Sequence, residues 1–579
     1  MRNSIRFGKS IITEVVIILI YILLINLKVA KVDVVIKGDG VGYYDYLPSL
    51  FIHHDLIRKD VPALIDSLRY NRIAKKLVYV DYNGFEVNKY PAGTAVLQLP
   101  FFYFAYLTTP LKGNNNDGYQ LPFQRAILYA TLFYLFLGIY FLKKILELYD
   151  IKKSVIVLSQ LLLVFATIVT NYANFNAGIS HVYSLFAINA FLYFTKSYFT
   201  KRNLNHFVVA CLFFGLILIL RQINILVLLF VPFMAGSLNN LKGGIRYVLK
   251  HPKKLLGGIL LTLAVFFIQS LLWYLQTGSF LLYSYQGEGF HFLNPQIINI
   301  LFSYQKGLFV YTPVLFISLF GLIWLAYKRR YYLVFMWLTF FTIVTYIFSS
   351  WHSWIYGCSY GSRVYIDYYG TFFILFALLL NGIPKGMKII VIILSFLTIP
   401  VNLIQAYQYK TYILHWTNMN KEKYWNVFLK TDNRYKGILW KKKYGFNNYY
   451  TVKEVSIGNI TTSAKNKFNN IYQVSSSAIP DFNKVSIIQI LLDNEFTEQN
   501  NSKIIVSIKD SEGDHSYYWH DPYLIHFAQK RLDKWQTGLY NFNFNSITDE
   551  KEKIIKIEVY SQKECNVLKN VKIKFWCYR

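Results

Sequence analysis

Long apolar runs alternate with short polar and basic segments through the first 405 residues of the chain. An α-helix needs roughly 20 apolar residues to cross the hydrocarbon core of a bilayer, and the longer runs reach that length. The pattern therefore predicts a polytopic α-helical membrane domain with about eleven transmembrane helices. The runs lie near residues 11–26, 124–142, 154–170, 179–195, 206–220, 222–236, 255–275, 308–327, 331–350, 366–380 and 387–405.

Basic residues set the expected orientation. Arg2, Arg6 and Lys9 precede the first apolar run, and no small-x-small cleavage site follows it. We therefore expect a retained signal anchor with the N-terminus in the cytoplasm.

The apolar stretch Ala92–Pro110 decides on which side of the membrane every later loop lies. If it lies at the interface instead of spanning, the basic clusters all fall on cytoplasmic loops, as the positive-inside rule requires. We therefore predict an interfacial or re-entrant helix here, a large external loop over about residues 28–123, and an external tail beyond Tyr407. The clusters are Lys143/Lys144/Lys152/Lys153, Lys196/Lys201/Arg202, Lys242 to Lys254, Lys328/Arg329/Arg330 and Lys385/Lys388.

The pattern changes to alternating apolar and polar residues near the C-terminus, with breaks at polar and glycine-containing turns. Such period-two alternation predicts an all-β, jelly-roll-like β-sandwich. The chain is thus divided into a transmembrane domain (1–407), a linker with a short helix (408–450) and an external β domain (451–579). The expected strands lie near 452–460, 484–492, 503–510, 537–544, 553–561 and 571–576.

Composition supports a membrane location. Hydrophobic residues make up 54% of the chain and charged residues 16%, well below the charged fraction of soluble domains. The net charge of +30 could indicate a nucleic-acid partner, but its placement between apolar runs indicates cytoplasmic loops instead. We expect membrane lipids as partners and no nucleic acid. A Lys-, Asn-, Ile- and Tyr-rich composition suggests an AT-rich bacterial genome and hence the plasma (inner) membrane.

Four cysteines are too few for a disulfide scaffold. Cys565 and Cys577 lie in the β domain and could pair in an oxidising compartment, which the sequence does not decide.

Chemically informative residues gather at the predicted external ends of the helices. The first cluster, after the first span, holds Asp39 between glycines, followed by Tyr43 and Asp45. A carboxylate that is partly desolvated at the bilayer edge becomes more basic, which suits a general base. The alternative is that Asp39 is a turn or N-cap aspartate.

Three cations lie at comparable positions. Lys89 precedes the interfacial stretch, Arg221 separates two apolar runs, and Arg363 follows a segment rich in small residues. Each could bind a phosphate group, and a charge near membrane depth needs a partner or a task. Snorkelling of Lys89 and an interfacial turn at Arg221 are the alternatives.

A further external loop carries Glu288 and His291, and Trp354 lies near the end of another span. Glu288 and His291 are three residues apart and could ligate a divalent cation, or be solvated polar residues. Trp354 could stack on a sugar, or belong to an aromatic belt at the interface. His181 is interpreted as a structural histidine.

Several function classes are disfavoured. The sequence has no P-loop, no dinucleotide-binding glycine fingerprint and no zinc-protease helix motif. The predicted spans hold no carboxylate at mid-depth, which argues against an ion-coupled transporter.

Three motifs resemble those of the GT-C superfamily of integral-membrane glycosyltransferases, which includes protein O-mannosyltransferases, aminoarabinose transferases and oligosaccharyltransferases. Asp39-Gly40-Val41-Gly42-Tyr43 resembles the family's Asp-Glu-x-x-Tyr motif, with glycine at the second acidic position. Lys89-Tyr90-Pro91 looks like the lysine/proline start of the next apolar helix. The segment 354–363 resembles a Trp-Gly-x-Ser-x-Gly-x-Arg element.

The resemblance covers residues 1 to about 405. It implies an enzyme that transfers a sugar from a polyprenyl-phosphate donor to a hydroxyl of a glycan, lipid or protein acceptor on the external face. Asp39 would be the general base, the reaction would invert the anomeric centre, and Lys89, Arg221 or Arg363 would hold the donor phosphate. Metal use is left open.

Two alternatives belong to other classes. One is a non-catalytic, membrane-anchored scaffold for glycan binding or polysaccharide export. The other is a transporter of a lipid-linked substrate.

Overall fold

A computed structural model describes most of the chain in two compact units, Met1–Ala406 and Tyr407–Arg579. The described residues are 11–23, 34–56, 78–109, 118–432, 435–437, 439, 449–461, 468–482, 485–494, 503–510, 516–520, 536–543, 552–560 and 567–578.

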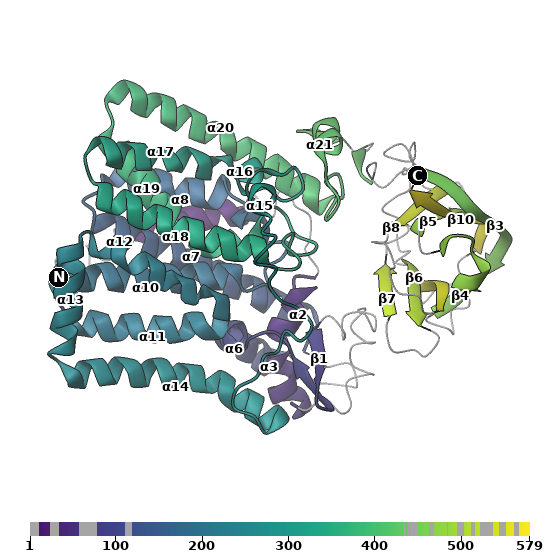
Figure 1. Ribbon diagram of the computed structural model, residues 1–579, viewed down its shortest axis with the longest axis horizontal. Helices are drawn as coiled ribbons and strands as arrows, with labels where there is room; N and C mark the ends of the chain where they lie inside the picture. The colour runs from purple at the N-terminus through teal and green to yellow at the C-terminus, as the bar shows by residue number, and fades with distance from the viewer. Residues whose placement is uncertain are drawn as a thin grey trace. The chain divides into compact units, whose positions relative to one another are not determined.

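The apolar runs predicted from the sequence all lie on helices of the first unit (Figure 1). Within the described ranges, five helices are long and apolar enough to cross a membrane, and a sixth span arises if the bent pair Gln222–Ala235 and Leu238–Leu249 counts as one. The chain is therefore a multi-pass membrane protein. The count of about eleven spans and the orientation of the termini stay predictions.

The helices that carry the runs are Ile11–Leu23, α7 (Leu121–Glu147), α8 (Lys153–Phe165), α10 (His181–Lys201), α11 (Leu204–Leu220), η2 (Gln222–Phe230) with α12 (Val231–Ala235), α14 (Pro252–Thr277), α16 (Leu308–Tyr311) with α17 (Pro313–Tyr327), α18 (Tyr331–Ser350), η3 (Arg363–Tyr368) with α19 (Tyr369–Gly382), and α20 (Lys385–Lys410).

Close helix packing depends on small residues. Helices α10, α11 and α14 lie side by side (Figure 1), and a Cβ atom at Gly215 of α11 would come within 2.9 Å of the Thr262 carbonyl oxygen of α14. Small residues let helix backbones approach in this way where no hydrophobic effect drives association. The opposite face of α14 exposes Leu260 and Leu263, as expected for a helix that contacts lipid.

One buried ion pair fixes the first helix to its neighbours. The Glu14 carboxylate is fully buried and accepts hydrogen bonds from Lys143 Nζ of α7 and Gln160 Nε2 of α8, the latter at 2.7 Å. A carboxylate at this position would be costly without such partners, so the pair selects one packing of the three helices.

The large loop predicted between the first helix and α7 contains ordered elements. Its hairpin turns at Asn83-Gly84, both with positive φ (53° and 84°), which is typical of a type I′ turn. The predicted interfacial stretch forms α6, a helix that contains Pro100. The elements are α2 (Asp39–Tyr44), α3 (Tyr46–Pro48), η1 (Ser49–His53), β1 (Tyr79–Tyr82), β2 (Phe85–Asn88) and α6 (Gly93–Thr108).

The start of α6 lies against the end of α11. A Cβ atom at Gly93 would come within 2.5 Å of the Ile219 backbone, so only glycine fits there. This contact brings the segment around Lys89 close to the break between α11 and η2, where Arg221 lies.

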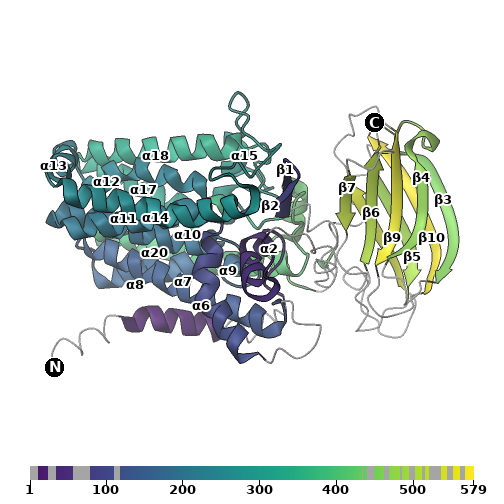
Figure 2. The same ribbon diagram turned by 90° about the horizontal axis from the view of Figure 1, so that it is seen from below.

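The described part of the second unit contains eight antiparallel strands in two sheets, seen in Figure 2. The sheet orders are β3-β10-β5-β8 and β4-β9-β6-β7, as in a jelly roll of two four-stranded sheets. The strands are β3 (Tyr449–Thr461), β4 (Phe468–Ser475), β5 (Val485–Asn494), β6 (Lys503–Asp510), β7 (Ser516–His520), β8 (Gln536–Asn543), β9 (Lys553–Tyr560) and β10 (Val567–Tyr578).

The predicted alternation explains the core of this unit. On β9, Ile555, Ile557 and Val559 are buried, while Lys556 and Glu558 between them point outward and pair with each other. The buried side chains of both sheets form one hydrophobic cluster, as expected for a sandwich. The predicted short helix of the linker is α21 (Lys421–Val427). The pairing of Cys577 with Cys565 lies outside the described residues.

We predict that Ile557→Ala destabilises the β unit by about 2–5 kcal/mol, because the truncated side chain leaves a cavity between the two sheets. Native-state hydrogen exchange of the full chain should show a matching loss of protection in strands β6 and β9. Lys556→Ala, on the outward face of the same strand, should change protection by less than about 1 kcal/mol. Equal effects of the two substitutions would contradict the assignment of the core face.

Candidate active site

Residues from six separate segments of the first unit line a cavity of about 430 Å³. The segments are α2, the β2–α6 connection, the start of α10, the break after α11, the loop after α14 and the turn between α18 and η3. The cavity contains most of the predicted site residues, namely Asp39, Tyr43, Lys89, Arg221, Glu288 and Arg363.

Glycines around Asp39 shape the first wall. Gly38, with φ of 52° and ψ of −132°, begins α2 in a conformation that favours glycine. A Cβ atom at Gly42 would overlap the Tyr90 ring at 2.1 Å. At Gly40 it would lie 3.2 Å from the backbone of Gly178, so this position has little room for the acidic side chain of the Asp-Glu-x-x-Tyr motif.

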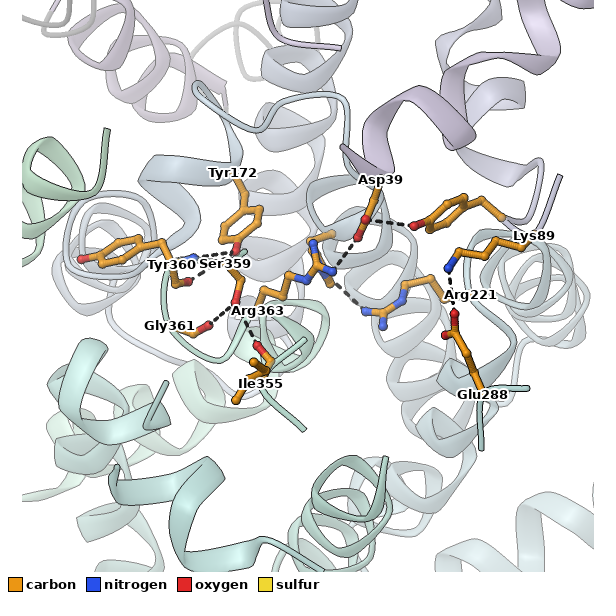
Figure 3. Close-up of polar contacts among 12 residues, drawn as sticks. Asp39, Lys89, Tyr172, Arg221, Glu288, Ile355, Ser359, Tyr360, Gly361 and Arg363 are labelled. Atoms are coloured by element: carbon orange, nitrogen blue, oxygen red, sulfur yellow. Dashed lines mark hydrogen bonds and ion pairs between the residues drawn. The ribbon is translucent and has the colours of Figure 1, made fainter. Parts of the chain in front are cut away.

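Asp39 is held by two partners. Its Oδ2 accepts a hydrogen bond of 2.5 Å from Arg363 Nη2, and its Oδ1 accepts one of 2.9 Å from the Tyr90 hydroxyl (Figure 3). Burial by itself would raise the pKa of Asp39, but Arg363, Tyr90 and Lys89 together outweigh burial and lower it below its usual value. The sequence-based expectation of a more basic carboxylate is therefore wrong, because it did not include the arginine partner.

The turn that carries Arg363 is fixed by hydrogen bonds to its neighbours. Lys306 Nζ donates to the Ser359 carbonyl oxygen, and the Ser362 hydroxyl donates to the Lys306 carbonyl oxygen at 2.6 Å. Gly361, with φ of 61°, bends the chain at this point. The Tyr360 backbone amide donates a hydrogen bond to the Tyr172 hydroxyl (Figure 3). These contacts direct Arg363 into the cavity.

Lys89 and Glu288 form a second ion pair, with 2.8 Å between Lys89 Nζ and Glu288 Oε1. The Lys89 carbonyl oxygen accepts a hydrogen bond from the Ser284 hydroxyl, so the loop after α14 is attached at two points. A β-bridge between Phe290 and Trp351 connects this loop to the end of α18.

Arg221 belongs to a third, more deeply buried group. Its Nη1 lies 2.9 Å from Asp367 Oδ2 and 3.1 Å from His181 Nδ1. Asn224 Nδ2 donates to the same oxygen of Asp367 at 2.7 Å, and His181 Nδ1 lies 2.8 Å from the other oxygen. Asp367 is fully buried, and a buried carboxylate needs partners for its charge and its oxygens. Arg221 balances the charge, and the three donors satisfy the oxygens.

Aromatic side chains complete the cavity. Tyr43 packs on Tyr90 with ring centroids 4.8 Å apart, and Tyr285 contacts both Tyr90 and Trp351. Aromatic faces next to charged groups form a surface on which a sugar ring can stack while its hydroxyls and an attached phosphate find polar partners.

Three predicted site residues lie outside the cavity lining. The carboxylate of Asp45 instead accepts hydrogen bonds from the Tyr79 and Tyr119 hydroxyls. His291 is exposed, and its backbone amide donates to the Ser350 carbonyl oxygen at 2.6 Å. Trp354 is half-buried, and the nearby Trp351 lines the cavity in its place.

Of the two alternatives for Glu288 and His291, the structure favours polar residues without a shared metal, because Glu288 pairs with Lys89 and His291 lies outside the cavity lining. Within the described ranges, no group of three or more His, Cys, Asp or Glu side chains could hold a metal ion.

Sequence reasoning missed Asp367 and Tyr90 as members of the site and interpreted His181 as structural. A signal for Asp367 was present, since a carboxylate at the start of an apolar run is a functional candidate by default. Tyr90 gave no such signal, because tyrosine is common throughout this chain.

No family model matches the sequence, and no curated protein matches it. Among solved structures, the chain is similar to the apo oligosaccharyltransferase of Archaeoglobus fulgidus, at 12% identity over 73% of this chain and 60% of that chain, with a TM-score of 0.39. Archaeal AglB from the same organism, in complex with an inhibitory peptide and a dolichol-phosphate, matches at 11% identity over 72% and 59% of the two chains, with a TM-score of 0.38. The match thus spans less than two thirds of the length of either archaeal chain.

The arabinosyltransferase EmbB from Mycobacterium smegmatis matches at 10% identity over 98% of this chain and 68% of that chain, with a TM-score of 0.32. These neighbours are GT-C glycosyltransferases, the superfamily that the motifs at Asp39, Lys89 and Arg363 resemble.

We predict that Gly42→Ala lowers the melting temperature of the purified protein, because its Cβ atom would displace Tyr90 from Asp39. Overpacking of this kind costs about 1–3 kcal/mol. Gly257→Ala on α14, where a Cβ atom meets no atom within 4 Å, is the matched control and should leave the melting temperature unchanged or higher. An unchanged melting temperature for Gly42→Ala would contradict the close packing of α2 on Tyr90.

We predict that the buried carboxyl group of Asp45 makes the stability of the protein depend on pH. Burial raises its pKa to about 7, with a smaller opposing contribution from the Tyr119 hydrogen bond. Because the folded-state pKa lies above the usual 3.8, the stability contributed by the protonated carboxyl is complete below about pH 4 and is lost as the pH rises to about 7. The melting temperature of the parent, measured from pH 4 to 8, should therefore fall relative to that of Asp45→Asn. Parallel curves for the two proteins would contradict the raised pKa.

Proposed function

We propose that the chain is a membrane glycosyltransferase that moves a sugar from a polyprenyl-phosphate donor to an acceptor hydroxyl. The observation that carries this proposal is the convergence in one cavity of a carboxylate, Asp39, with Lys89, Arg221 and Arg363 and an aromatic wall. Glycosyl transfer from a lipid phosphate needs these three kinds of group, namely a base, cations for the leaving phosphate and a surface for the sugar.

In the proposed reaction the donor tail lies in the bilayer and its phosphate enters the cavity beside Arg221 and Arg363. The Asp39 carboxylate takes the proton of the acceptor hydroxyl while the acceptor oxygen forms a bond to the anomeric carbon. The bond from that carbon to the phosphate oxygen breaks, and the electron pair leaves with the polyprenyl phosphate. This single displacement inverts the anomeric centre.

The cations act on the leaving group. Negative charge develops on the phosphate oxygen as the bond breaks, and donors held in place before the reaction stabilise that charge. Arg221 suits this task because Asp367 holds its guanidinium group, and Asp367 is itself held by His181 and Asn224. A planar guanidinium can also bind phosphate through two donors at once.

The acceptor is left open between a glycan, a lipid and a protein. The positive-inside distribution supports a site on the external face of the plasma membrane, with the β domain on the same side. The chain's own residues do not select a particular sugar.

We predict that Asp39→Asn reduces sugar transfer by about 10²–10⁴-fold, the usual contribution of a general base. The assay uses the full chain in lipid vesicles with a panel of radiolabelled polyprenyl-phosphate sugars and measures release of polyprenyl phosphate. Asp81→Asn, an exposed carboxylate on β1 outside the cavity lining, should leave transfer unchanged.

Undiminished transfer by Asp39→Asn would remove Asp39 as the base while leaving the reaction class in place. No transfer with any donor and acceptor would favour the non-catalytic scaffold. Translocation of a lipid-linked sugar that survives Asp39→Asn would favour a transporter.

A further inference from the structure

Each of the three cations of the cavity forms an ion pair with a carboxylate. Lys89 pairs with Glu288, and the two arginines pair with Asp367 and Asp39. A phosphate that enters this cavity therefore meets cations that already have anionic partners, and it has to compete with at least one of them.

The two arginine–carboxylate pairs differ in the burial of the carboxylate and in the other groups that hold it. The side chain of Asp367 is 0% exposed, and it is held by His181 and Asn224 as well as by Arg221. Separating Arg221 from it would leave a buried carboxylate with two neutral donors, which is costly. Arg221 is therefore the fixed cation of the cavity.

The pair of Arg363 with Asp39 is more open. The Asp39 side chain is 30% exposed, faces the cavity and keeps the Tyr90 hydroxyl as a second partner when Arg363 leaves. Lys89 also lies near enough to stabilise the charged carboxylate. Exchange of the arginine from Asp39 to an incoming phosphate thus replaces one charge-assisted hydrogen bond by another.

We propose that Asp39 and the donor phosphate compete for Arg363, so that donor binding releases Asp39 to act on the acceptor hydroxyl. This inference rests on the proposed function and adds a second role to Arg363. Before the donor binds, Arg363 holds Asp39 in a weakly basic state. After binding, Arg363 neutralises the phosphate and the carboxylate regains its basicity, so deprotonation of the acceptor follows donor binding.

Competition predicts that removal of Asp39 frees Arg363 and strengthens binding of the donor phosphate, although the same substitution lowers transfer. Loss of a negative charge beside the phosphate would also strengthen binding, but only competition makes that gain depend on Arg363. Coupling of this kind typically changes affinity by about fivefold or more.

The test measures the affinity of the full chain in lipid nanodiscs for polyprenyl phosphate without a sugar, by isothermal titration calorimetry. We expect Asp39→Asn to bind about fivefold more tightly than the parent. Arg363→Gln should bind more weakly, and the double variant Asp39→Asn/Arg363→Gln should bind no more tightly than Arg363→Gln alone. Asp39→Ser is a second neutral variant, should the asparagine variant fold poorly.

The double variant separates competition from local charge repulsion, since repulsion alone would make it bind more tightly than Arg363→Gln. Two further variants serve as controls. Asp39→Glu keeps the charge and should show no gain in affinity. Asp81→Asn removes an exposed carboxylate outside the cavity lining and should bind like the parent. A gain in Asp81→Asn equal to that in Asp39→Asn would overturn the proposal.

The outcomes also separate this proposal from the proposed function. A parent protein that does not bind polyprenyl phosphate would refute the donor class, and the competition with it. A parent that binds, together with unchanged or weaker binding by Asp39→Asn, would overturn the competition alone and leave the glycosyltransferase in place.

Discussion

The ion pair between Asp39 and Arg363 joins residues 324 positions apart in the sequence, and both residues line the cavity. Asp39 begins a short helix that follows the first apolar helix, and Arg363 begins the short helix that leads into α19. Desolvation makes such a pair a poor source of net stability. Its effect is to place a carboxylate and a guanidinium group next to each other at the wall of the cavity.

Three glycines make this arrangement sterically feasible, because each allows a close approach or a turn that a larger residue would prevent. Gly42 leaves space for the Tyr90 ring beside Asp39, and Gly93 lets α6 begin against the end of α11 next to Arg221. Gly361 bends the chain before Arg363. Each of these positions would otherwise force apart the segments that carry the charges, so the glycines determine the site as much as the charged residues do.

The elements were largely predictable from the sequence, because period and run length are local properties. Apolar runs marked the helices, and alternation marked β3, β5, β6, β8, β9 and β10. Strand β4, with the sequence FNNIYQVS, and the short β7 show no clear alternation of apolar and polar residues. Their pairing with β9 and β6 in the folded unit defines them instead.

Site residues were predictable as candidates but not as partners. Asp39, Lys89, Arg221 and Arg363 stood out because charge at membrane depth is unusual. Which carboxylate pairs with which cation is a property of the fold, and for this reason the direction of the Asp39 pKa shift was wrong and the role of Asp367 was missed. Asp45 was a candidate site residue like Asp39, but its carboxylate accepts hydrogen bonds from tyrosine hydroxyls and lies outside the cavity lining.

The short helix η3 connects the fixed and the exchangeable arginine sites. It carries Arg363, which pairs with Asp39, and Asp367, which holds Arg221, four residues apart. A substitution that distorts the backbone of η3 would therefore disturb both cation sites, and a loss of activity there would not identify which one matters. Asp39 lies on a separate helix and takes part in only one of the two arginine pairs. Its substitution therefore affects one of the two arginine pairs and leaves the ion pair of Arg221 with Asp367 in place.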